Sequence, residues 1–148
     1  MTSITPFLWF DGLAEQAAEF YTSLFGGHII DVSRLPDGSA FVVKFMLDDR
    51  EYLAMNGGPG HALTDAFSLS VNAGEQDRID ELWEALTADG GHESQCGWLV
   101  DRFGLSWQIL PTRLPELMSG PHAGAVIEAL MGMQRIIIAD LEAAASPA

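Results

Sequence analysis

One order of secondary-structure signals occurs twice along this chain of 148 residues. In each half a short apolar run is followed by an amphipathic helical pattern, a Gly-Gly pair and further alternating runs. The best local match is between Phe25–His28 (FGGH) and Asp89–His92 (DGGH), each directly after a predicted helix. Because self-similarity at a fixed spacing indicates repeated structural units, we expect two similar halves, each with the order strand, helix and three strands (βαβββ).

The first half begins with the apolar and aromatic segment Ile4–Phe10, which is typical of a strand. Apolar residues then recur at helical spacing from Leu13 to Phe25, where a Gly-Gly pair provides a C-terminal stop. Turn residues separate three further predicted strands: His28–Arg34, Ala40–Leu47 and Glu51–Asn56. A loop rich in Gly and Pro, residues 57–63, ends this half.

The second half repeats the order, with a strand at Phe67–Ala73 and a helix at Gln76–Ala88. Two strands are predicted at Cys96–Val100 and Leu105–Leu110, with a weaker one near Glu93. We therefore expect an α+β domain over residues 1–112, built from repeats at about 1–58 and 64–112. Apolar segments at 114–118 and 123–133 and an alanine-rich tail predict a C-terminal helical extension, residues 113–148.

One helix covers only one face of a sheet, so each half leaves a second face that needs a partner. We expect two curved mixed sheets to face each other around a cleft that binds a small molecule. Side chains alternate along a strand, so Phe7 and Trp9 would both point toward that cleft.

The charge balance excludes several partners. Seven Lys and Arg stand against 21 Asp and Glu, a formal charge of −14, which repels nucleic acids and anionic lipids. No apolar run approaches the roughly 20 residues that span a bilayer, and the N-terminus lacks the pattern of a secretory signal. Cys96 is the single cysteine, which excludes an internal disulfide. We expect a cytoplasmic protein that binds neither nucleic acid nor membrane.

Five segments carry a family resemblance: Ile4–Phe10, Phe20-Tyr21 followed by Phe25–Gly27, Phe67–Val71, Gln95–Trp98 and Asp101–Pro111. Together they resemble the PhnB-like family of the vicinal oxygen chelate superfamily, which also includes glyoxalase I, extradiol dioxygenases and bleomycin resistance proteins. The resemblance implies a glyoxalase-like fold of two βαβββ modules and a homodimer. Members are often labelled demethylubiquinone methyltransferase-like, but this chain lacks a glycine-rich turn for a nucleotide-like cofactor and is short for a Rossmann-type methyltransferase.

The resemblance also locates the metal ligands of glyoxalase-type relatives. The corresponding positions here are Thr5 or Pro6, Tyr52, Ala66 or Phe67, and Gln108. Of these side chains only the Gln108 amide is suited to ligation, and a neutral amide is a weak ligand. We therefore expect no metal at this site and no cofactor. A divalent metal held through Gln108 and a ligand set displaced by one residue is the alternative.

The expected ligand-binding residues combine aromatic walls with a few neutral polar groups: Phe7, Trp9, Tyr52, Asn56, Ser68, Cys96, Trp98 and Gln108. Trp9 and Trp98 either stack on a planar ligand or pack within the sheets. Gln108 and Trp107 are adjacent and must point to opposite faces, so an inward Gln108 puts Trp107 under the helix. Cys96 is expected beside the cleft, because no neighbour in the sequence would activate a nucleophilic thiol.

Three functions are consistent with these residues. The first is a metal-independent small-molecule-binding protein, which we favour. The second is a metal-assisted enzyme of the same fold, such as an isomerase or a dioxygenase. The third is an interaction module in which side chains fill the cleft.

Overall fold

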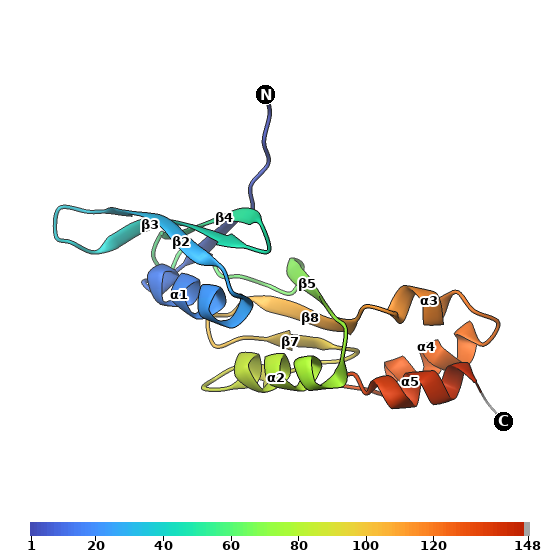
Figure 1. The fold of residues 1–148 in the computed structure, drawn as a ribbon. Helices are drawn as coiled ribbons and strands as arrows, with labels where there is room; N and C mark the ends of the chain where they lie inside the picture. The colour runs from blue at the N-terminus through green and yellow to red at the C-terminus, as the bar shows by residue number, and fades with distance from the viewer. Residues whose placement is uncertain (147–148) are drawn as a thin grey trace. The chain divides into compact units, whose positions relative to one another are not determined.

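The computed structural model describes residues 1–146 and forms two compact units, the first comprising residues 1–63 and the second beginning at Thr64 (Figure 1). Each unit contains one four-stranded mixed sheet, and one helix connects its first two strands. The predicted α+β fold of two βαβββ modules with a C-terminal helical extension is confirmed.

The first unit follows the predicted order closely. Its elements are β1 (Phe7–Phe10), α1 (Ala14–Phe25), β2 (His28–Arg34), β3 (Ala40–Leu47) and β4 (Arg50–Asn56). The sheet has the order β1-β4-β3-β2, with β1 parallel to β4 and the other pairs antiparallel. A parallel pair needs a long connection between its strands, and here that connection includes α1, β2 and β3.

Helix α1 covers one face of this sheet. The rings of Tyr21 on α1 and Phe45 on β3 lie 6.4 Å apart, and both side chains are buried. Strand alternation and register put Leu8, Val43 and Ala54 on the same face, and all three are buried. Burial of these apolar side chains stabilises the unit. In each unit, the open face is the sheet face opposite the one that the connecting helix covers.

The duplicated Gly-Gly pair has a steric origin. Gly26 and Gly90 have backbone φ angles of 75° and 112°, which favour glycine because it has no Cβ atom. Gly27 and Gly91 allow close approach: a Cβ would lie 1.8 Å from the Met46 oxygen in the first case and 2.5 Å from the Leu86 oxygen in the second. Each pair ends a helix and returns the chain to the sheet.

The second unit repeats this topology with shorter strands. Its elements are β5 (Ser68–Ala73), α2 (Gln76–Thr87), β6 (His92–Glu93), β7 (Trp98–Val100) and β8 (Ser106–Pro111), in the sheet order β5-β8-β7-β6. Leu82 and Trp83 of α2 are buried, as are Leu99, Trp107 and Ile109 of the sheet. Trp83 is therefore a core residue, and its indole N–H donates to Glu93.

The predicted strand at Cys96–Val100 begins only at Trp98. Cys96 and Gly97 have φ angles of 59° and 86°, which are incompatible with an extended strand. The backbone N–H of Trp98 donates to the Gln95 oxygen, so residues 95–98 form a turn into β7. Because side-chain alternation does not extend through this turn, the strand pattern does not determine the direction of the Cys96 side chain.

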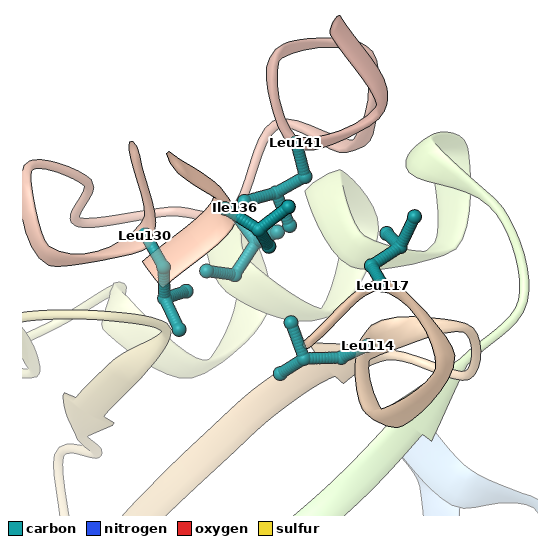
Figure 2. Close-up of a cluster of buried hydrophobic side chains, with 6 residues drawn as sticks. Leu114, Leu117, Leu130, Ile136 and Leu141 are labelled. Atoms are coloured by element: carbon teal, nitrogen blue, oxygen red, sulfur yellow. The ribbon is translucent and has the colours of Figure 1, made fainter. Parts of the chain in front are cut away.

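The extension forms three helices, α3 (Leu114–Met118), α4 (Ala123–Met131) and α5 (Ile138–Ala145), within the second unit. They enclose a small apolar core, in which the labelled side chains converge (Figure 2). Its buried residues are Leu114, Leu117, Val126, Leu130, Ile136 and Leu141. None of the helices in residues 1–146 has the length and apolar character needed to cross a membrane.

Candidate ligand-binding faces

Three of the predicted site residues lie together on the open face of the second sheet. In the strand register Gln108 of β8 is flanked by Ser70 of β5 and Trp98 of β7. The Gln108 side-chain Nε2 donates to Ser68 Oγ at 2.9 Å. Trp107 points the opposite way and is 2% exposed, as the alternation predicted. This face therefore presents an aromatic ring beside a hydrogen-bonded amide and hydroxyl.

Ser106 adds an unusual group to this face. It is the register partner of Ser68 and Val100, it is 1% exposed, and within residues 1–146 its hydroxyl has no hydrogen-bond partner. A buried hydroxyl without a partner is destabilising by about 1–3 kcal/mol. Such a group is retained at a cost in stability. Sequence reasoning missed Ser106, although it lies two residues before Gln108 and so shares its face.

Cys96 lies apart from this face. Its Sγ is 3.7 Å from the Met131 Sδ, and its side chain packs against the apolar core of the extension. The backbone N–H groups of Cys96 and Gly97 donate to the Met133 and Gln134 oxygens, each at 2.8 Å. The extension therefore holds the turn that precedes Trp98.

The open face of the first sheet is largely apolar. Phe7 is 52% exposed, whereas Trp9 packs against the loop that follows β4. The Trp9 indole N–H donates to the Gly58 oxygen at 2.9 Å, and its ring meets His61 edge-on at 4.8 Å. A Cβ at Gly57 would lie 2.2 Å from the Trp9 ring. Phe7 is thus the more accessible aromatic side chain on this face.

Tyr52 and Asn56 lie on the helix-covered face of the same sheet, with Ala54 between them in β4. Tyr52 stacks on Phe45 with ring centroids 5.6 Å apart, and burial raises the pKa of its hydroxyl above the usual 10.0. Asn56 Oδ1 accepts from the Ala14 N–H at 2.8 Å, and its Nδ2 donates to the Ala40 oxygen at 3.1 Å. Asn56 therefore fixes the start of α1.

The side chains present do not fit a glyoxalase-type metal site. Within residues 1–146 no group of three or more His, Cys, Asp or Glu side chains is arranged to hold an ion. Of the positions at which the resemblance led us to expect metal ligands, only Gln108 carries a side chain suited to ligation, and its amide nitrogen is bonded to Ser68. Tyr52 stacks within the helix-covered face instead.

Two βαβββ units, each with a four-stranded mixed sheet, define a glyoxalase-like protein of the vicinal oxygen chelate superfamily. A family model described as 3-demethylubiquinone-9 3-methyltransferase matches residues 2–110. The chain belongs to this family, which is also called PhnB-like. The C-terminal extension lies outside the matched residues.

Solved structures agree with this assignment. The PhnB protein from Bacillus cereus is 30% identical and has a TM-score of 0.70, with 75% of this chain and 100% of that chain covered. A protein from Pseudomonas aeruginosa is 19% identical, with a TM-score of 0.63 and coverage of 75% and 98%. The fosfomycin resistance protein FosX from Listeria monocytogenes, in complex with Mn(II) and dihydroxypropylphosphonic acid, is 15% identical, with a TM-score of 0.60 and coverage of 80% and 99%. No curated protein sequence matches the chain.

The family description implies a methyl-donor cofactor, and the residues present do not fit one. A nucleotide-like cofactor is usually bound by a glycine-rich turn between a strand and a helix. Here β1 is joined to α1 by residues 11–13, which contain one glycine, and β5 is joined to α2 by Gly74 and Glu75. The first N–H of α1 is already bonded to Asn56. We derive no methyl-transfer step.

Proposed function

We propose that this protein binds a small, moderately apolar molecule without a glyoxalase-type metal, using the open face of the second sheet. The observation that carries the proposal is the placement of Ser68, Trp98 and Gln108 on one face, with Gln108 bonded to Ser68 and opposite Trp98. A planar ligand would stack on the indole ring of Trp98, because aromatic faces favour offset or edge contacts with other rings.

The polar groups on this face suit a neutral partner. Gln108 offers a carbonyl acceptor in addition to the donor that Ser68 already uses, and hydroxyl groups both donate and accept. Aromatic area with a few directional polar groups is the usual composition of a small-molecule site.

The test measures the binding of a panel of planar compounds by tryptophan fluorescence and by calorimetry. Gln108→Ala should lower the affinity for a bound compound by about tenfold, the loss expected for one or two hydrogen bonds. The same substitution at Gln16, an exposed position on α1, is the matched control and should leave affinity unchanged. Trp98→Phe should remove most of the ligand-induced quenching.

Two results would contradict the proposal. One is the absence of binding across a broad panel. The other is a stoichiometric divalent ion in protein purified without chelator, which would favour the metal-assisted enzyme. Elemental analysis of the purified protein measures the second directly.

We further propose that the protein is a cytoplasmic homodimer. Its single cysteine is consistent with a reducing compartment. Light scattering during size-exclusion chromatography tests the dimer, and a mass of 16.0 kDa in solution would contradict it.

A further inference from the structure

Lys44 is the only lysine in the chain, and it lies on an internal strand of the first sheet. It is the register partner of Leu53 on β4, which is in turn the register partner of Phe7 on β1. These three residues therefore form a row across the open face. The adjacent row consists of Val42, Met55 and Trp9. The half-buried residue Lys44 thus lies beside an apolar surface.

No ion pair among residues 1–146 neutralises the charge of Lys44. Asp31 is its register partner on β2, and Glu51 lies two register pairs away on β4. Neither carboxylate lies within 4.0 Å of the Lys44 ammonium nitrogen, the limit for an ion pair. Within residues 1–146 the Lys44 side chain also forms no hydrogen bond.

The arginines behave differently. Five of them form ion pairs with carboxylates: Arg34, Arg78, Arg102, Arg113 and Arg135. The sixth, Arg50, lies exposed at the turn into β4. Lys44 is therefore the cation that projects from a sheet face without a counter-ion in the described chain.

We infer that the open face of the first sheet binds a small molecule with an apolar body and a single anionic group. The body would lie on Phe7, Leu53 and Met55, and the anionic group would contact the Lys44 ammonium. A charge beside apolar groups is screened less than one in bulk water, so the contact is stronger there. The inference extends the proposed function to the first unit, and it rests on that proposal only in requiring an open sheet face to bind a small molecule.

The net charge makes this contact selective. A protein of charge −14 repels anions over most of its surface. An anionic ligand would therefore be retained only where a cation meets it at close range, and its binding should weaken as salt screens the pair. The nearby Asp31 carboxylate opposes an anion, so its removal should strengthen binding.

The experiment compares two probes that share one body: naphthalene carboxylate and its neutral methyl ester. Lys44→Met keeps most of the side-chain volume. It should lower the affinity for the carboxylate probe by about tenfold, which is typical of a lost charge-assisted contact. The same variant should leave the ester within about twofold. Lys44→Arg should retain binding of both probes, and Asp31→Asn should tighten the carboxylate alone. Phe7→Ser should weaken both probes.

Each outcome decides the inference. A loss confined to the carboxylate in Lys44→Met, with folding confirmed by circular dichroism, supports it. Equal affinities of both probes in the wild-type protein and Lys44→Met overturn it, as does failure of either probe to bind the wild-type chain. If other planar compounds still respond to Gln108→Ala and Trp98→Phe, only this inference fails. If no compound binds, the proposed function fails with it.

Discussion

The Trp107 indole N–H donates to the Asp101 carboxylate at 2.9 Å in the interior of the second unit. Asp101 is 2% exposed and also accepts from the backbone N–H groups of Phe103 and Leu105, at 2.8 and 3.0 Å. One side chain therefore shapes the turn between β7 and β8 and fixes Trp107 on the helix-covered face. Because side chains alternate, that orientation also directs Gln108 to the open face.

Asp101→Ala should lower the free energy of unfolding by about 2–4 kcal/mol, because it removes the carboxylate that accepts from three N–H groups, two of them in buried hydrogen bonds. Asp101→Asn keeps one acceptor oxygen for the turn and should cost less. Urea unfolding followed by circular dichroism measures both variants. Equal stability of Asp101→Ala and the wild-type protein would show that the turn does not depend on this carboxylate.

A second prediction concerns the attachment of the extension. The Gln76 amide donates to the Ile136 oxygen at 2.9 Å and accepts from the Ile138 N–H at 2.8 Å. Gln76→Ala should free this segment and expose the turn at Cys96. Alkylation of the Cys96 thiol should then accelerate by about fivefold, the factor that corresponds to about 1 kcal/mol of lost local stability.

Cys96 is the single thiol, so mass spectrometry reads its alkylation without ambiguity. Gln16→Ala, at an exposed position on α1, is the matched control and should react at the wild-type rate. An unchanged rate in Gln76→Ala would mean that the extension is held without this amide.

A third prediction follows from the bond between Asn56 and Ala14. Asn56→Ala should destabilise the protein by about 1–2 kcal/mol, since it leaves an N–H at the start of α1 without an acceptor. Asn56→Asp keeps the acceptor and puts a negative charge at the positive end of the helix, so this variant should lose less stability than Asn56→Ala. Asn72→Ala, an exposed position on β5, is the control in the same denaturation experiment. A larger loss in Asn56→Asp than in Asn56→Ala would contradict the assigned role.

The fourth prediction concerns alkaline pH. Burial raises the pKa of the Tyr52 hydroxyl above its usual 10.0, so the unfolded chain loses this proton at lower pH than the folded chain. The resulting stabilisation is fully present below pH 10.0 and is lost as pH rises through the pKa of the folded protein. Between those pH values the unfolding free energy of the wild-type protein should fall more steeply than that of Tyr52→Phe. Parallel pH dependences would contradict the shift.

The architecture could be predicted because its signals are local. Gly26-Gly27 and Gly90-Gly91 mark the ends of two amphipathic helices, and the structure gives each pair a steric reason that only glycine satisfies. The strand β7 was predicted two residues too long because Cys96 has a left-handed backbone conformation. A non-glycine residue rarely adopts that conformation, and nothing in the local sequence indicates it.

The orientation of side chains on β4 was harder to predict. Between Tyr52 and Asn56, strand β4 carries apolar side chains on both faces of the sheet. Leu53 and Met55 lie on the open face, and Ala54 is buried under α1. Apolar character alone therefore does not reveal which face is covered. On β8 the polar Gln108 alternates with Trp107 and Ile109, and there the sequence indicated the orientation that the structure has.

The tie between the extension and the turn before Trp98 is made by main-chain oxygens of Met133 and Gln134. Replacement of either side chain preserves those acceptors, although Met133 also packs against the apolar core of the extension. A proline at position 96 or 97 would instead abolish a donor. Related sequences should therefore tolerate substitution of Gln134 more readily than insertions or deletions between Gly132 and Ile136.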